Sequence, residues 1–342
     1  MRIGIPILLT IVVLLVAAMM LTAGWDRPPV AVEQTGYRGL GMVQVDNPRV
    51  ESALAAGNQV PEPPWPLEPS EGPLASEVYE NVQVLGDVPS DHFDRLMAAI
   101  TEWVAPEQGC TYCHNEENLA EDSVYTKIVA RRMLQMTRHI NGEWDEHVAA
   151  TGVTCYTCHR GEPVPQYIWF AQPVRTGPGL VGNRTGQNMA AASVGTASLP
   201  ADPFGPYLTE GGNIRVVSNE ALPPAGSGLG PSIKQAERTY GLMMHVSDAL
   251  GVNCTFCHNS RSFFAWDQST PQRTTAWYGI QMLRDLNSDY LEPLGRQYPH
   301  NRLGPTGDAP KANCATCHQG VSKPLLGVSM VQDYPSLAGP TP

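Results

Sequence analysis

The stretch Cys110-Thr111-Tyr112-Cys113-His114 introduces a pattern, Cys-x-x-Cys-His, that the chain uses four times. The other copies are Cys155-Tyr156-Thr157-Cys158-His159, Cys254-Thr255-Phe256-Cys257-His258 and Cys314-Ala315-Thr316-Cys317-His318. Together they contain all 8 cysteines of the 342 residues, and a histidine follows each pair although only 9 positions are histidine. The eight thiols therefore share one kind of chemistry.

Cys-x-x-Cys-His is the attachment motif of c-type haem. Its two thiols add to the vinyl groups of the porphyrin, and the adjacent histidine binds the iron. A zinc site or a redox dithiol is the alternative, but neither requires a histidine after every pair. The sequence therefore predicts four covalently bound c-type haems, and it leaves no cysteine for a disulfide or a lipid anchor.

Apolar residues at helical spacing predict a helix before each motif. The expected helices run from Ser90 to the residue before Pro106, between Ser123 and Gly142, from a capping box of Ser232 and Gln235, and from Thr270-Pro271 to about Pro293.

The chain also repeats itself. Leu96-Met97-Ala98 before the first motif corresponds to Leu242-Met243-Met244 before the third, so each half reads helix, motif, helix, motif. With 31 prolines and 32 glycines, we expect a mainly α fold with long irregular segments. The predicted architecture is a multihaem cytochrome c built from two pseudo-two-fold dihaem halves, plus one N-terminal transmembrane helix.

The N-terminus predicts a membrane anchor. After Met1 and Arg2 the chain is apolar from Ile3 to Ala23, which at about 1.5 Å per residue matches the roughly 30 Å core of a bilayer. A cleaved signal peptide is the alternative, but its apolar region is shorter, and Leu21 is too large for a cleavage site. We expect a retained helix, with Arg2 in the cytoplasm and the remainder exported.

Composition divides the chain into six segments. The prolines of residues 27–88 predict a non-helical, extended arm, with a disordered tether as the alternative. The expected segments are the anchor (1–26), the Pro-rich arm (27–88), the first dihaem half (89–170), a Gly/Pro-rich connector (171–231), the second dihaem half (232–330) and a C-terminal tail (331–342).

Each iron of an electron carrier also needs a ligand on its second face, and methionine gives a higher potential than histidine. Met97 and Met243 lie on corresponding apolar helix faces before the first and third motifs, and Met133 precedes the second. Such methionines are ordinarily core packing. The repeat and the need for ligands instead make them the expected partners of the irons bound by His114, His159 and His258, with Met97, Met133 and Met243 in that order.

The fourth site departs from the repeat. Gly279 stands where the counterpart of Met133 belongs, so another residue must bind the iron of His318. The sequence alone ranks His147 and His300 equally, each against the alternative of an ordinary surface histidine. The full set of candidates is His147, His300, His245, His139 and Met282.

The net charge is −11, with only 22 basic residues. A nucleic-acid partner is therefore excluded, because phosphate binding needs clustered lysine and arginine. The acidity suits a basic soluble partner that docks by charge complementarity, and simple solubility is the alternative reading.

With these four motifs and the methionine-bearing helices before them, residues 85–330 resemble the tetrahaem cytochrome subunit of the photosynthetic reaction centres of purple and related bacteria. In that family three irons have His/Met ligation, and the fourth has two histidines. The second of these comes from the segment before the second motif, so the resemblance implies His147 rather than His300. Some members carry a lipidated N-terminal cysteine, which this chain lacks, so here the helix must be the anchor.

The resemblance also implies a function. Such a subunit transfers electrons from a soluble cytochrome c or high-potential iron–sulfur protein to the photo-oxidised bacteriochlorophyll pair. The implied partners are the L and M core subunits and the surrounding light-harvesting complex, with the haem domain on the periplasmic side of the inner (intracytoplasmic) membrane. Quinol-oxidising tetrahaem cytochromes are the alternative, but they are shorter and lack the connector. A multihaem enzyme such as a nitrite reductase would need an iron open to substrate.

Overall fold

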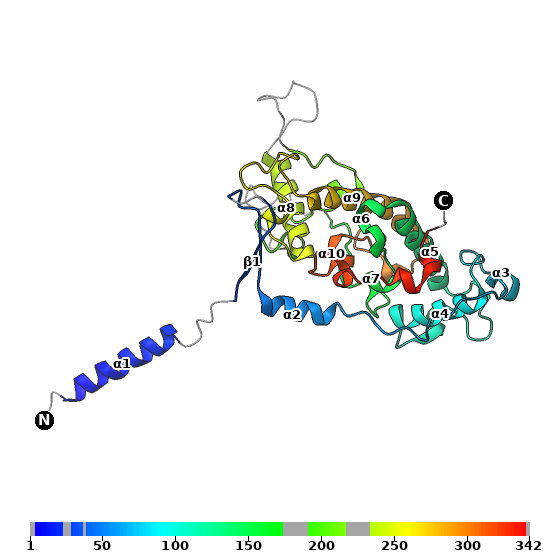
Figure 1. Cartoon of the computed structure of the whole chain (residues 1–342), viewed down its shortest axis with the longest axis horizontal. Coiled ribbons are helices and arrows are strands. Elements are labelled where there is room, and N and C mark those ends of the chain that lie inside the picture. The colour runs from blue at the N-terminus through cyan, green and yellow to red at the C-terminus, as the bar shows by residue number, and fades with distance from the viewer. Residues whose placement is uncertain (1–3, 23–28, 37–38, 174–190, 217–232, 340–342) are drawn as a thin grey trace, which may run out of the picture.

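The computed structural model describes residues 4–22, 29–36, 39–173, 191–216 and 233–339 (Figure 1). Within them the chain is mainly helical and contains one two-stranded sheet. Irregular segments connect the helices, as the proline and glycine content predicts. Ser232, the expected cap of the third helix, lies outside the described residues.

The four long helices of the haem region lie close to their predicted positions. α4 ends before Pro106, and α9 begins with Pro271 at its first turn, where the fixed φ of proline suits a helix. α9 continues into a π-helical turn, η7 (Leu286–Leu291), and a 3-10 turn, η8 (Glu292–Arg296), so the helical path passes Pro293. The bounds are α4 Ser90–Val104, α5 Tyr125–Glu143, α8 Ile233–Leu250 and α9 Pro271–Asp285.

Each motif forms a short helical turn of its own. The turns are η1 (Gly109–Tyr112), α7 (Cys155–His159), η6 (Cys254–Phe256) and α10 (Cys314–His318). α7 packs against α4, α10 packs against α8, and α7 and α10 also contact each other. The second and fourth motifs therefore lie side by side between the two pairs of long helices (Figure 1).

Short elements complete this part of the chain. α6 (Asp145–Val148) follows α5 and packs against α9. A segment between the first and second motifs thus contacts the helix that lies between the third and fourth. The others are η2 Ala149–Thr151, η4 Ala192–Val194, η5 Gly205–Thr209, η9 His300–Arg302, η10 Pro324–Gly327, η11 Val331–Asp333 and η12 Pro335–Leu337.

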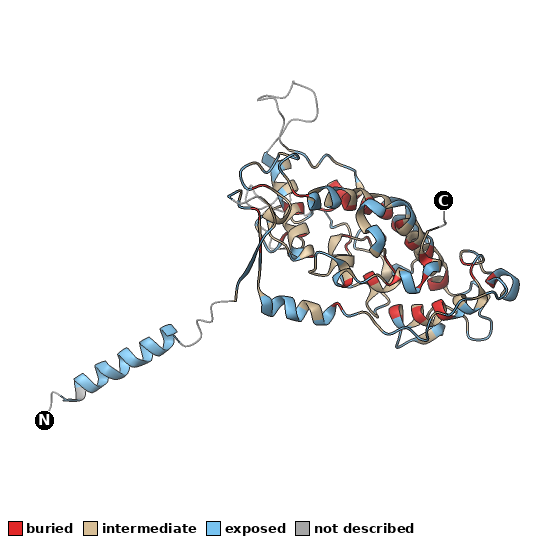
Figure 2. Cartoon of the chain, viewed as in Figure 1, coloured by how far each residue is buried: buried red, intermediate tan, exposed pale blue. Residues whose placement is uncertain are grey.

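The N-terminal helix α1 (Gly4–Thr22) stands apart from the helices of the motif region, and its described side chains are exposed (Figure 2). No helix in the described residues meets the length and hydropathy of a membrane span.

The arm contains helix, so the prediction that its prolines exclude helix from residues 27–88 is wrong. α2 (Pro48–Gly57) and α3 (Ala75–Val78) both lie within it. Asn47 caps α2 by accepting the Arg49 N–H at 3.1 Å, and Pro48 occupies the first turn. Proline is tolerated there because its missing N–H has no partner inside the helix.

The arm contacts two of the motifs. Strands β1 (Ala31–Gln34) and β2 (Val43–Asp46) pair antiparallel, and β2 borders the third motif. The Val43 carbonyl accepts hydrogen bonds from Asn253 Nδ2 and Thr255 Oγ1, each at 2.6 Å. Beyond α2, the Asn58 side chain accepts a bond of 3.0 Å from Arg160, which follows the second motif. Residues 31–58 thus extend from the third motif to the second.

Buried apolar side chains form three clusters (Figure 2). The first joins α4 and α5 to the C-terminal residues, and Tyr334 and Leu337 are buried in it although they belong to the segment predicted as a tail. The second lies around α8 and α9, and the third joins α5 to the end of α9. Their buried members include Leu96, Trp103 and Leu134; Trp169, Phe204, Leu208, Leu242 and Ile280; and Ile140, Val153, Met282 and Leu286.

Candidate haem-binding site

The second and fourth motifs are built alike. Each is a five-residue helix preceded by a polar cap, Thr154 or Asn313, whose backbone N–H donates to the threonine hydroxyl three residues later at 2.9 Å. The residue after each histidine, Arg160 or Gln319, ends the helix in the left-handed region with φ of 51° and 49°. So short a helix is unstable alone, so these caps and the packing on α4 and α8 define it.

The first and third motifs share a different construction. Each is a 3-10 turn held from outside by a threonine, because Thr126 Oγ1 donates to the Tyr112 carbonyl and Thr270 Oγ1 donates to the Phe256 carbonyl. Both contacts join residues 14 positions apart. The asparagine after each histidine, Asn115 in the first motif, turns the chain by accepting a backbone N–H two residues later.

All four motif histidines have the same orientation. The Nδ1–H of each ring donates to a nearby backbone carbonyl, which fixes the tautomer and leaves Nε2 as a free acceptor. Metal-binding histidines are commonly oriented in this way. The distances are 2.8 Å from His114 to Leu119, 2.9 Å from His159 to Glu162, 2.9 Å from His258 to Phe263 and 3.0 Å from His318 to Val321.

Burial keeps three of these rings in the form that binds a metal. It lowers the pKa of His159 and His258 below the ordinary value. Burial, with a further contribution from nearby His147, lowers the pKa of His318 to about 4. A neutral imidazole is required of a ligand because the iron takes the lone pair that a proton would occupy.

A cavity of about 1270 Å³ lies among the motifs. It exceeds the roughly 300–1,000 Å³ of an ordinary small-molecule pocket. Two of the expected methionine ligands, Met97 on α4 and Met133 on α5, line it together with cysteines of all four motifs. Met243 on α8 is not among the residues described as lining this cavity and packs against the second core cluster. The histidines that line it are His114, His147, His159 and His318.

The candidate residues for the fourth site lie in different surroundings. The rings of His147 and His318 have centroids 6.0 Å apart, which leaves room for one metal ion whose bonds to nitrogen are about 2 Å. His147 Nδ1 donates to the Thr275 carbonyl at 2.9 Å, so its Nε2 is also left as an acceptor. Burial lowers the pKa of His147, as it does for His159, His258 and His318.

The other candidates lie elsewhere. His300 is exposed on η9, and His139 pairs with Asp285 at 2.6 Å. His245 is buried with its ring against Phe204, and Met282 belongs to the third core cluster. Among the described residues, none of these side chains makes a ring contact with His318, whereas the His147 ring meets it edge to face.

Gly279 has a second role that the sequence reading missed. A Cβ built at this position would approach His147 Cε1 to 2.5 Å, so the imidazole packs directly against the backbone of α9. A glycine inside a helix costs about 1 kcal/mol relative to alanine. A glycine inside the predicted helix was therefore the signal in the sequence that another group packs against this position, and that group is the His147 ring.

Comparison with known proteins decides the family. The family model of the photosynthetic reaction centre cytochrome C subunit matches residues 26–338. The chain is 55% identical to the photosynthetic reaction center cytochrome c subunit of Rubrivivax gelatinosus (94% of this chain, 87% of that protein) and 50% identical to that of Thermochromatium tepidum (96% and 80%). The Roseobacter denitrificans subunit is 45% identical over 89% of this chain and 85% of its own length. The chain belongs to the photosynthetic reaction centre cytochrome c subunit family.

Membership confirms the resemblance drawn from the motifs. The protein is an electron-transfer component of a photosynthetic reaction centre, and its relatives are electron carriers rather than enzymes. A cytochrome c subunit binds c-type haem covalently, and the Cys-x-x-Cys-His turns, with their fixed imidazoles and neighbouring cavity, fit that group. A more distant relative, cytochrome c-554 of Chloroflexus aurantiacus, is 27% identical over 65% of this chain and 64% of its own length.

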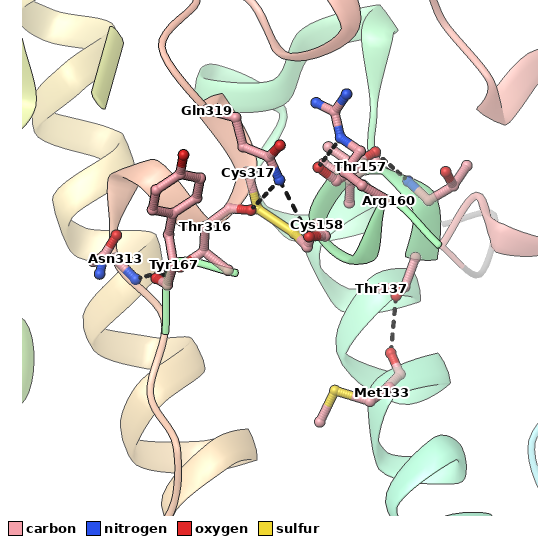
Figure 3. The surroundings of a disulfide bond; sticks show 12 residues. Met133, Thr137, Thr157, Cys158, Arg160, Tyr167, Asn313, Thr316, Cys317 and Gln319 are labelled. Atoms are coloured by element: carbon pink, nitrogen blue, oxygen red, sulfur yellow. Dashed lines mark hydrogen bonds between the residues drawn. A yellow bond between two sulfur atoms is a disulfide. The ribbon is translucent and has the colours of Figure 1, made fainter. Parts of the chain in front are cut away.

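One pair of thiols in this reaction-centre cytochrome differs from the sequence expectation. Cys158 and Cys317 form a disulfide where α7 meets α10, although the motifs left no cysteine for one (Figure 3). The physical reason is proximity: their Cα atoms are 4.4 Å apart, within the range that a disulfide spans. Gln319 Nε2 also crosses this contact, donating to the Cys158 carbonyl at 3.4 Å. A sulfur in a disulfide cannot also form a thioether, so haem attachment at these two motifs requires the reduced pair.

Proposed function

We propose that this protein carries four c-type haems and transfers electrons from a soluble periplasmic donor to the photo-oxidised bacteriochlorophyll pair. The main support for four haems is that a cysteine pair followed by a histidine occurs four times. In each case the histidine Nδ1 donates to a backbone carbonyl. Bound haem supplies a one-electron Fe(III)/Fe(II) couple. The protein's part is to hold each iron, to close its second face and to set its potential.

The proposed ligands follow the sequence order. Met97, Met133 and Met243 close the irons of His114, His159 and His258, and His147 closes that of His318. Support comes from the two methionines in the cavity and from the facing rings of His147 and His318. With every iron closed, the protein exchanges electrons without binding a small-molecule substrate.

The two-half architecture is part of the proposal. The first and third motifs share the threonine contact, and the second and fourth share the capped helix. Because α7 and α10 are in contact, the haems of the second and fourth motifs would occupy the middle of a row of four haems. The haems of the first and third motifs would lie at the two ends of that row.

We assign the third-motif end to the membrane and to the L and M core subunits. The β1–β2 hairpin is bonded to Asn253 and Thr255 in this region, and α1 precedes β1 in the chain. α1 has 19 residues, about 28 Å at the usual rise, and its sequence has no charged residue. The loop after the third motif exposes Phe263, Phe264 and Trp266, side chains that suit a protein or membrane surface.

This anchor assignment has a simple check. Mass spectrometry of the purified protein should find a chain that retains residues 3–23, and a mature N-terminus near Gly24 would contradict a retained helix.

Light-induced spectroscopy tests the function itself. In membranes that contain the protein, a flash that oxidises the bacteriochlorophyll pair should be followed by oxidation of a haem of this subunit and re-reduction of the pair. A pyridine haemochrome assay on the purified protein should give four haems per chain. A bacteriochlorophyll pair that recovers at the same rate in membranes lacking the subunit would contradict the proposal.

A further inference from the structure

The segment from Tyr298 to Arg302 follows α9 in sequence but reaches the first motif in space. Tyr298 and Arg302 line the same cavity as Tyr112, which lies between the two cysteines of the first motif. The ring of Tyr298 meets that of Tyr125 edge to face, with centroids 6.3 Å apart. Tyr298, which lies between the third and fourth motifs in the sequence, is therefore close to the first motif.

Arg302 differs from the other partly or fully buried cations of the cavity. Lys127 and Arg131 pair with Asp122 at 3.2 and 2.7 Å, and Lys311 pairs with Asp308. Among the described residues, the Arg302 side chain has no hydrogen-bond or ion-pair partner, although it is half-buried.

The neighbours of Arg302 are phenols rather than carboxylates. Its charge acts on Tyr112 and Tyr298, two rings whose pKa values burial raises, that of Tyr298 to about 12. Both phenols are therefore neutral at pH 7 and cannot balance the guanidinium. A half-buried cation is only partly hydrated, so an anion beside Arg302 would be favourable.

We propose that Arg302 binds a propionate of the haem attached to Cys110 and Cys113. This inference rests on the proposed function, because it requires that haem. Haem brings two carboxylates, and the planar guanidinium of arginine binds a carboxylate through two parallel hydrogen bonds. Arg302 neutralises negative charge near the iron, which favours the reduced state and raises the potential of the first haem.

The test compares the four midpoint potentials of the native protein with those of Arg302→Gln and Arg302→Lys. In Arg302→Gln, the equilibrium constant for reduction of one haem should fall about tenfold. This corresponds to a midpoint potential lower by about 59 mV for a one-electron couple. Arg302→Lys should restore most of the shift because it keeps the charge. Arg296→Gln is the matched control, since Arg296 is exposed at the end of η8, just before this segment, and is not among the residues that line the cavity.

The affected haem is identified with Met97→His, which should change the potential of the first haem independently. A shift in the same haem supports the proposal, as does loss of that haem from Arg302→Gln alone with retention in Arg302→Lys. Four unchanged potentials, or a shift in a different haem, would overturn it. A native chain that lacks four haems would instead contradict the proposed function.

Discussion

Two histidines that looked equivalent in the sequence occupy very different positions. His147 faces His318 across 6.0 Å and is held by the Thr275 carbonyl, whereas His300 is exposed on η9. Sequence spacing predicted the proximal ligands because each histidine is covalently adjacent to its cysteine pair. It could not rank His147 above His300 as a distal ligand, because their positions depend on which helix packs on which, and α6 packs on α9 at Gly279.

Replacing His147 should change the fourth haem alone. His147→Met should raise its potential, because a thioether donates less strongly than imidazole and favours Fe(II). His147→Ala should open the iron, so that carbon monoxide binds rapidly to the reduced protein. Redox titration and carbon monoxide difference spectra measure the two effects. His300→Ala is the control, and an open haem in that variant with none in His147→Ala would refute the assignment.

The three methionines make a matching set of single-residue tests. Met97→Leu, Met133→Leu and Met243→Leu preserve the size and apolarity of the side chain while removing the sulfur. Each should lower the potential of one haem, or open it to carbon monoxide, and should leave the other three unchanged. A methionine whose replacement alters neither the spectrum nor the potential is core packing only. We expect this outcome for Met243 more than for Met97 or Met133, because Met243 is not among the residues that line the cavity.

At the scale of elements, helix boundaries were predictable where a cap or a proline marks them. Ser90, Pro106 and Pro271 lie at such boundaries, and α4 and α9 begin or end beside them. α2 was missed because Pro48 was counted as a helix breaker, although proline at the first turn is compatible with a helix. α5 begins at Tyr125 rather than Ser123. Its first turn holds the preceding loop through Lys127, which contacts Asp122 and the carbonyls of Leu119 and Glu121, and composition does not reveal such contacts.

Asp122 should make the stability of this region depend on pH. Its carboxylate accepts from Arg131 at 2.7 Å and lies 3.2 Å from Lys127 on the first turn of α5. Chiefly through Arg131, these partners lower its pKa from 3.8 to about 2. A carboxylate with a lowered pKa stabilises the fold above its unfolded pKa, and that contribution disappears as the pH falls from about 4 to 2.

Asp122→Asn should therefore melt at a lower temperature than the native protein at pH 7, and the difference should shrink below pH 4. Thermal melts followed by circular dichroism at several pH values measure this. Glu117→Gln, in the same loop and exposed, is the control that removes a carboxylate without removing either ion pair. A difference between Asp122→Asn and the native protein that stayed constant from pH 7 to pH 2 would show that the ion pairs are not its cause.

At the scale of the whole molecule, the internal repeat anticipated the matched construction of the motifs. It did not anticipate the contacts that break the repeat. Tyr334 and Leu337, near the C-terminus, pack in the first core cluster with residues of α4 and α5. Residues 31–58 contact both the third motif and the residue after the second. Such contacts join residues far apart in the chain without a periodic pattern, so only tertiary packing reveals them.

The charge of the molecule predicts how its donor binds. Glu116, Glu117 and Glu121 are exposed around the first motif, within a chain of net charge −11. A basic donor cytochrome should be attracted there, so the second-order rate of its oxidation should fall as salt rises, because the Debye length shortens to about 8 Å at physiological ionic strength.

Stopped-flow or flash kinetics at increasing ionic strength test this surface. Glu116→Lys and Glu117→Lys should slow the donor reaction at low salt, and Glu51→Lys on α2 should change it less. A rate independent of salt in all variants would favour an apolar docking surface, as for an iron–sulfur donor, over the electrostatic one.

The position of α6 also has a consequence for biosynthesis. His147 is made long before His318, so a ligand for the last iron already exists when the last motif emerges from the ribosome. We expect the fourth site to be completed only after α9 has docked on α6, so its completion would depend on the folding of both halves. A chain interrupted anywhere between the two histidines would leave the ligand that we propose on α6 without its partner, His318. A closed fourth iron would therefore mark a subunit whose chain has been made at least as far as its last motif.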